Sequence, residues 1–307
     1  MTKRLQNRIA ESRFTFPVTI IYGIAVWIMA GALERGLYAQ LAMFVAGTLM
    51  MVALNNSNAL IRIYSRMVSC SFVMITCAST FLFSSIESSA VSICFILFYL
   101  SIMRSYQDKR SPGIVFYSFA CIGIASLFFV QILYFVPFLW ILMATNLMAM
   151  THKMFLASII GIAMPYWFGA CYYIYTDQTD LLIAHFAELI RFEPLLQYDS
   201  LDIHRLATLG MLAILTLIGI IHYMRNSYLD KIRTRMIYEF FITIDILAIV
   251  FLALQPSHID QLLPVITINT SCLYAHYSAL TRTRITNATF IIVGLAMVAL
   301  TIFNLAL

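Results

Sequence analysis

One polar stretch of this chain combines acids, bases and a cation over a short distance. It reads TDQTDLLIAHFAELIRFEPLLQYDSLDIH, residues 176–204. The side chains that can exchange a proton or carry charge there are His185, Glu188, Arg191, Asp199, Asp202 and His204, with Arg205 directly after them. Histidine and carboxylate groups serve as general acids and bases, and arginine pairs with phosphate. We therefore treat these seven as candidate catalytic residues that could position a lipid-linked phosphate or act on a sugar hydroxyl. The alternative is a connector whose charges face water.

Part of the same stretch has the pattern of an amphipathic helix. In DLLIAHFAELIRF the apolar residues recur at 181, 182, 183, 186, 189, 190 and 192, which is helical spacing. Asp180 can cap the start and Pro194 ends the pattern. We expect a short helix that lies on the outer membrane interface.

Other polar residues interrupt long apolar runs. Asp245 stands in FITIDILAI, about nine residues or roughly 13 Å into an apolar segment. Antiparallel threading brings Asn269 or Thr270 to its depth and pairs Glu239 with His276. A charged group at that depth costs at least ~2.5 kcal/mol, so Asp245 must face protein, be protonated or touch water. These four intramembrane polar positions, Asp245, Asn269, Glu239 and His276, either lock helices together or form a functional polar site.

The composition places these groups in a membrane protein. The 307 residues are 62% hydrophobic and 11% charged, whereas soluble domains carry about 25% charged residues. Such a chain has little length left for a separate soluble domain, so we treat 1–307 as one integral membrane domain. The net charge of +5 is explained by basic cytoplasmic loops, and no nucleic-acid partner is expected. No metal-ligand spacing, nucleotide loop or hydrolase motif occurs, so neither a metal site nor a cofactor is predicted.

Hydropathy predicts an all-α, polytopic bundle of about eleven transmembrane spans. They cover approximately 17–33, 39–54, 67–84, 88–103, 113–129, 132–150, 154–175, 205–224, 237–254, 262–280 and 286–305. The apolar block 113–150 is the ambiguous part. Its length and Pro137 favour two spans with a turn near Gln131, and a single span with an interfacial stretch is the alternative.

The loop charges predict the orientation. Basic residues gather before the first span and in every second turn, namely Lys3, Arg4, Arg8, Arg13, Arg62, Arg66, Arg104, Lys109, Arg110, Lys153, Arg225, Lys231, Arg233, Arg235, Arg282 and Arg284. The intervening turns are acidic or nearly uncharged. Because cytoplasmic loops hold the excess of lysine and arginine, we expect a cytoplasmic N-terminus, an external C-terminus and an external 176–204 loop.

One of the basic turns is also rich in asparagine. It reads NNSNALIRIYSR, residues 55–66. Its many hydrogen-bond donors could bind lipid head groups or a partner protein. The alternative is an inside turn whose polar groups cap its own backbone.

Two stretches carry a resemblance to known families. They are PGIVFYSFACIGIASLFFVQILYFVPFLWILMATNLM and, after a basic turn, GIAMPYWFG. Through them the chain resembles an uncharacterised multi-span inner-membrane family of Bacteroidota, which has no catalytic signature to carry over. The threading is also similar to O-antigen polymerase-like proteins and other lipid-linked sugar transferases. That similarity implies charged residues at the outer face that act on a polyprenyl-linked sugar.

Three functions follow as hypotheses for a multi-pass protein of the cell inner membrane. The first is an enzyme or helper that handles a lipid-linked envelope glycan, with membrane lipids and a polyprenyl-linked glycan as partners. The second is a non-catalytic subunit that binds other membrane-protein subunits. The third is a proton-coupled secondary transporter that uses Asp245. The first predicts a lateral, lipid-sized groove joined to the 176–204 loop, and the third predicts a midplane cavity at Asp245.

Overall fold

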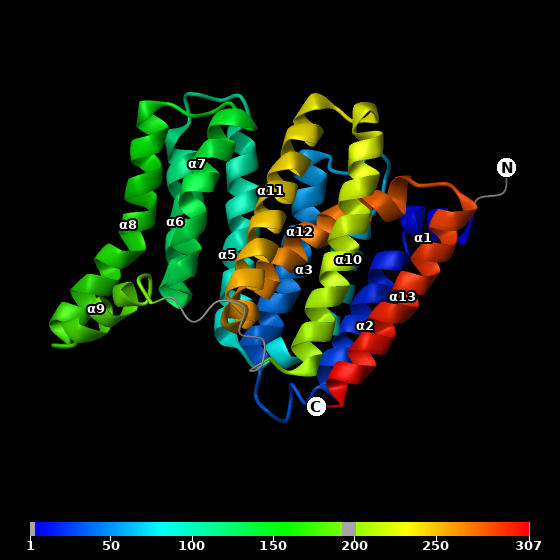
Figure 1. Ribbon diagram of the computed structural model, residues 1–307, viewed down its shortest axis with the longest axis horizontal. Helices are drawn as coiled ribbons and strands as arrows, with labels where there is room; N and C mark the ends of the chain where they lie inside the picture. The colour runs from blue at the N-terminus through cyan, green and yellow to red at the C-terminus, as the bar shows by residue number, and fades with distance from the viewer. Residues whose placement is uncertain (1–3, 192–200, 307) are drawn as a thin grey trace.

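The described residues form a bundle of helices without strands. The computed structural model describes residues 4–191 and 201–306. Within these ranges, six helices are long and apolar enough to cross a membrane, and seven if the bent pair α1 and α2 forms one span. The chain is therefore a membrane-embedded helical protein (Figure 1).

The six long apolar helices are α3 (Tyr38–Asn58), α5 (Ile86–Ile102, continued by η2 at Met103–Ser105), α8 (His152–Tyr175), α10 (Ile203–Asn226, continued by η4 at Ser227–Leu229), α11 (Ile232–Leu254) and α13 (Arg284–Leu305). The other elements are α1 (Leu5–Glu11), α2 (Thr15–Met29), α4 (Met67–Ala78), η1 (Thr80–Leu82), α6 (Pro112–Phe128), η3 (Val130–Phe135), α7 (Val136–Thr145), α9 (Thr179–Ala187), η5 (Pro256–His258) and α12 (Ile259–Leu280).

Each of the eleven predicted stretches contains a helix, but eleven membrane crossings remain a prediction. The 12 residues of α4 rise only about 18 Å, which is less than the hydrocarbon thickness of roughly 30 Å. In the ambiguous block 113–150, α6 ends at Phe128 and the backbone of Phe129 is extended. The 3-10 segment η3 then occupies the expected turn near Gln131 and leads into α7. The block is thus two helices, not one continuous one.

The helix α12 forms the core of the bundle. Of its 22 residues, 19 are buried, including Asn269, Thr270 and His276. A helix surrounded by protein does not contact lipid, so its sequence need not be apolar on any face. This explains why α12 is absent from the six helices with membrane-spanning composition.

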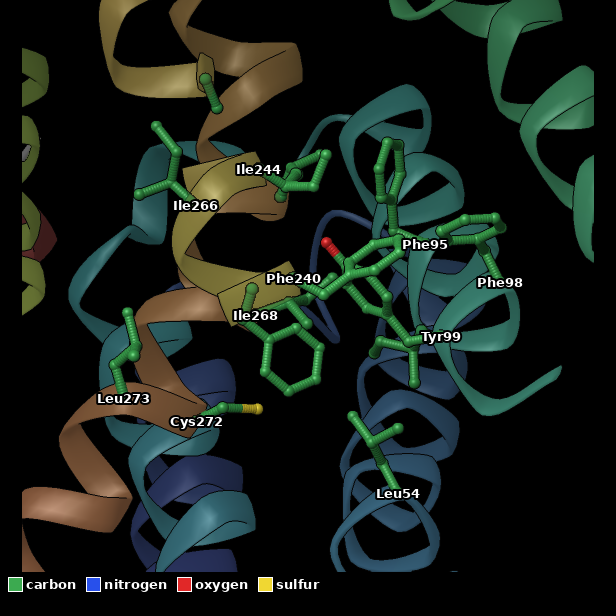
Figure 2. Packing of buried hydrophobic residues seen from close by; sticks show 14 of the residues in the cluster. Leu54, Phe95, Phe98, Tyr99, Phe240, Ile244, Ile266, Ile268, Cys272 and Leu273 are labelled. Carbon is green, nitrogen blue, oxygen red and sulfur yellow. The ribbon is translucent and has the colours of Figure 1, made fainter. Parts of the chain in front are cut away.

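Aromatic side chains fill the space between α5 and α11. Tyr99 lies edge-on to Phe240 and Phe241, with ring centroids 6.1 and 5.0 Å away. Phe98 joins the same cluster from the preceding residue of α5 (Figure 2). Edge-to-face pairs of this kind add about 0.5–1.5 kcal/mol each beyond their burial. They fix which face of α5 points toward the polar core described below.

Glycines allow α6 and α8 to pack with their backbones close together. A Cβ atom at Gly161 would lie 2.5 Å from the carbonyl oxygen of Phe116, and one at Gly123 would lie 2.7 Å from that of Ile162. Small residues permit such close approach between membrane helices. This contact holds α8, and with it α9, at one side of the bundle (Figure 1).

The two chain ends lie at opposite ends of the bundle (Figure 1). Two hydrogen bonds fix the helix α1 beside the α12–α13 turn. Gln6 Nε2 donates to the Ser278 carbonyl at 2.7 Å, and Asn7 Nδ2 donates to the Thr281 carbonyl at 2.9 Å. The predicted basic turns α5–α6, α7–α8, α10–α11 and α12–α13 lie at this same N-terminal end of the bundle. The basic charges of these turns predict that this end of the bundle faces the cytoplasm.

Candidate functional site

The predicted amphipathic helix exists, with different limits. Helix α9 covers Thr179–Ala187, and Gln178, not Asp180, occupies its N-cap position. Asp180 lies in the first turn, where its charge favours the helix N-terminus. Pro194, the predicted end, lies outside the described residues. The apolar side chains Leu181 and Ile183 are more than half exposed, as expected for a helix at a membrane interface.

His185 on α9 lies against α6 and α8. Its Nε2 atom is 3.1 Å from the Ser126 carbonyl oxygen and 3.4 Å from the Tyr166 hydroxyl. The same hydroxyl donates to Ser126 Oγ at 2.8 Å. A carbonyl only accepts, so we assign the His185 proton to Nε2, which leaves Nδ1 as the acceptor nitrogen. A histidine of this tautomer can accept a proton or a hydrogen bond from a substrate hydroxyl.

Apolar grooves run along α8 on both of its sides. One of about 450 Å³ lies between α7 and α8 and includes Trp140 and Phe186 among its lining residues. A second of about 570 Å³ shares Ala163, Tyr166 and Phe186 with it. The third, of about 550 Å³, lies between α6 and α8 and includes His185. Side chains of α9 line all three, so these grooves join the loop that carries the predicted acid–base residues.

Arg205, by contrast, belongs to the main bundle. It forms a bidentate ion pair with Asp260 of α12, with both nitrogen–oxygen distances 2.8 Å. Its guanidinium also lies over the ring of Phe81, 5.4 Å from the centroid. The planar guanidinium fits a carboxylate through two parallel hydrogen bonds. Arg205 therefore connects the starts of α10 and α12.

His204 also makes contacts within the bundle. Its Nδ1 atom lies 2.9 Å from Asn304 Oδ1, and its ring stacks on Phe303 at a centroid distance of 4.2 Å. Asn304 in turn donates to Thr208 Oγ1 and to the Ala78 carbonyl. These contacts join α10 to α13 and α4.

The predicted catalytic group is therefore divided between two places. His185 lies in the arm formed by α6, α8 and α9, whereas His204 and Arg205 lie at the start of α10 (Figure 1). Glu188 and Arg191 are exposed beyond the end of α9. Asp202 occupies the N-cap of α10 without a side-chain cap bond. Asp199 lies outside the described residues.

Replacing Arg205 with methionine is expected to lower the free energy of unfolding by about 1–2 kcal/mol. Both side chains are about one-third exposed, so solvent weakens their attraction. The two parallel hydrogen bonds still make the interaction stronger than that of an ordinary surface ion pair. Chemical or thermal unfolding of the detergent-solubilised protein would measure the loss. Glu34→Gln, in an exposed turn, is the control with no expected change. A loss equal to that of the control would contradict the assigned role.

Asp245 is fully buried and has hydroxyl partners. Its Oδ2 atom accepts from Thr216 Oγ1 at 2.8 Å and from Thr270 Oγ1 at 3.3 Å. The predicted partner Thr270 is therefore present, whereas the Asn269 side chain makes no hydrogen bond of normal geometry to a described residue. Thr216 was not among the predicted residues. Its place in the apolar run LAILTLIGI is the signal that could have identified it.

The predicted pair of Glu239 and His276 is wrong. Glu239 is exposed on α11 and accepts from Asn146 Nδ2 at 3.1 Å. His276 instead contacts Asp230 in the α10–α11 turn, with Nε2 and Oδ2 2.9 Å apart. Matching the depths of two helices left their rotation undetermined, and the rotation of α12 places His276 against Asp230.

The contact of His276 belongs to a cluster that the sequence did not single out. Asp230, whose side chain is 2% exposed, also lies 3.6 Å from Arg62. The ring of His222 is 5.3 Å from that of His276. A lone acid within a basic turn, as in SYLDKIR, is the signal that could have identified Asp230.

The asparagine-rich turn makes contacts within the protein. Asn55 Nδ2 donates to the Ser65 carbonyl at 3.0 Å, and Arg66 donates to Asn56 at 3.2 Å. Arg233 of α11 donates to Asn58 at 3.2 Å. These bonds fit the interpretation of a self-capped turn that also contacts α11.

Comparison with known proteins adds no assignment. No protein-family model matches the chain, and neither does a curated protein or a solved structure.

Proposed function

We propose that this protein is an integral inner-membrane protein that binds a lipid-linked envelope-glycan substrate at the outer face of the membrane. The observation that carries the proposal is the set of apolar grooves, 450–570 Å³ in volume, along both sides of α8. Such grooves, open to the side of a bundle, suit an isoprenoid chain. The lateral groove joined to α9 is the feature expected of this function from the sequence.

The ends of the grooves suit a polar head group. His185 and Tyr166, which line them, offer an imidazole and a hydroxyl. The nearby side chains Trp167, Tyr172 and Tyr175 of α8 are 71%, 63% and 88% exposed. Exposed tryptophan and tyrosine are typical of the membrane–water interface. The lipid chain would then lie along α8 in the hydrocarbon, with its phosphate and sugar near α9.

The proposal includes the orientation predicted from charge. With eleven spans, a cytoplasmic N-terminus and an external C-terminus, α9 and the grooves beside it face the outside. The similarity in threading to O-antigen polymerase-like proteins implies that outer-face residues act on a polyprenyl-linked sugar on this side.

Filling the grooves tests the proposal. Ala163 lines two of them, so Ala163→Trp is expected to reduce binding of a photoreactive polyprenyl phosphate at least about tenfold. Crosslink yield, mapped by mass spectrometry in nanodiscs, is the measurement. Ala157→Trp on the same helix, outside the lining of these grooves, is the matched control and is expected to label like the wild type.

Two results would contradict the proposal. One is equal labelling of Ala163→Trp and Ala157→Trp. The other is equal competition by polyprenyl phosphate and by a saturated phospholipid of the same charge, which would show an ordinary lipid-facing surface.

A second candidate is a non-catalytic subunit of a membrane complex. The observation that favours it is the division of the charged residues, with Arg205 bound by Asp260 and His204 by Asn304. Purification in mild detergent with a stable partner, and no lipid selectivity, would support it. The grooves along α8 do not include Asp245, so they offer no support for proton-coupled transport.

A further inference from the structure

Several polar atoms in the centre of the bundle have no hydrogen bond of normal geometry to any described residue. They are Asp245 Oδ1, the Oδ1 and Nδ2 atoms of Asn269, and the hydroxyl of Tyr99. All three side chains are 0% exposed, and they come from three different helices, α11, α12 and α5. Roughly 90% or more of buried polar groups in proteins are bonded, so a group of orphans needs an explanation.

These atoms belong to one neighbourhood. Thr216 and Thr270 both donate to Asp245 Oδ2, and their hydroxyl oxygens are 2.7 Å apart. The Asn269 amide is next to Thr270 in the chain and lies close enough to the Asp245 carboxyl and the Tyr99 hydroxyl to interact with both, without a hydrogen bond of normal geometry. The site therefore offers a carboxylate oxygen, an amide oxygen and three hydroxyl oxygens.

Charge and ligand type indicate what this site binds. A buried carboxyl group is neutral when protonated and needs a compensating positive charge when ionised, and the polar contacts of Asp245 among the described residues come from neutral side chains. Hard cations take oxygen ligands, and divalent sites usually combine several carboxylates, whereas this site has one. We propose that Asp245, Asn269, Tyr99, Thr216 and Thr270 bind a monovalent cation, Na⁺.

A small cavity lies beside α5 and α12, the helices that carry Tyr99 and Asn269. It measures about 50 Å³, lies between α2, α3, α4, α5 and α12, and has Ser88, Ser92 and Thr267 in its wall. That volume holds roughly three or four water molecules. Ser88, Ser92 and Tyr99 share one face of α5, and Ser92 is about 10 Å along the helix from Tyr99.

The test is the dependence of unfolding on the cation. The detergent-solubilised wild type is unfolded by heat in NaCl, KCl and choline chloride at one ionic strength. A ligand that binds only the folded state raises the melting temperature with its concentration, and we expect a saturable rise of about 5 °C that is specific to NaCl. Asp245→Asn removes the charge and should abolish the rise. Glu239→Gln, an acid-to-amide change on the exposed side of the same helix, should retain it.

If Asp245→Asn does not fold, a substitution of a neutral ligand provides the test instead. Asn269→Ala retains the carboxylate, and the NaCl concentration for half the effect should rise at least about tenfold. Equal melting temperatures of the wild type in all three salts would overturn the proposal and indicate water at the orphaned atoms. An unchanged sodium response in Asp245→Asn would overturn it as well. Neither result bears on lipid binding along α8.

Discussion

Asp230→Ala is expected to lower the free energy of unfolding by about 3–5 kcal/mol, because it removes a buried carboxylate that both Arg62 and His276 contact. Asp230 and His276 are 2% and 1% exposed, and their atoms are 2.9 Å apart. His276 Nδ1 has no hydrogen-bond partner in the described part of the chain, so the loss of Asp230 leaves the imidazole without a hydrogen bond to these residues. Arg62 loses its nearby carboxylate in the same change. Unfolding by heat or by titrated denaturing detergent would measure the loss.

Two companion variants separate polarity from packing. Asp230→Asn keeps the size and an acceptor oxygen, so its loss should be about half as large. The double variant Asp230→Ala with His276→Phe removes both polar partners, and it should be more stable than Asp230→Ala alone because no imidazole is left unpaired. A loss below about 1 kcal/mol for Asp230→Ala would show that water replaces the carboxylate and that the α10–α11 turn is not fixed through it.

The positions of the helices could be predicted because apolar composition and chain breaks have direct physical causes. Low charge indicated membrane helices, and the block around Gln131 had too many residues for one span. Helix α12 was also found, although its buried polar residues lower its apolar character. Hydropathy could not show that α12 is the helix surrounded by the others, because the hydropathy of a segment does not depend on which helices pack against it.

The arrangement of side chains could be predicted only where one geometric variable was enough. Depth alone brought Asp245 and Thr270 together. The contact of His276 depended in addition on the rotation of α12, which is set by packing against α10 and α11. His185 and His204 are close in the chain but separated in space, because α9 stays with α8 while α10 begins in the main bundle (Figure 1).

Gly219→Ala is expected to lower the free energy of unfolding by about 1–3 kcal/mol, the usual effect of overpacking. A Cβ atom at Gly219 would lie 2.7 Å from Leu273 Cβ and 3.0 Å from its carbonyl carbon, so α10 must move away from α12. Thr216 is one turn away on α10 and bonds Thr270 of α12 at 2.7 Å, so the movement also lengthens a contact of the polar core. Unfolding in detergent would measure the loss.

A matched control for this variant lies on the same helix. A Cβ built at Gly210 would meet no described neighbouring group within 4 Å, so Gly210→Ala should be neutral or stabilise by up to about 1 kcal/mol through reduced backbone freedom. Leu273→Ala should not rescue Gly219→Ala, because the contacting atoms are Cβ and the backbone, which alanine retains. Rescue by Leu273→Ala, or equal stability of the two glycine variants, would show that α10 and α12 are not held together by close backbone contact at Gly219.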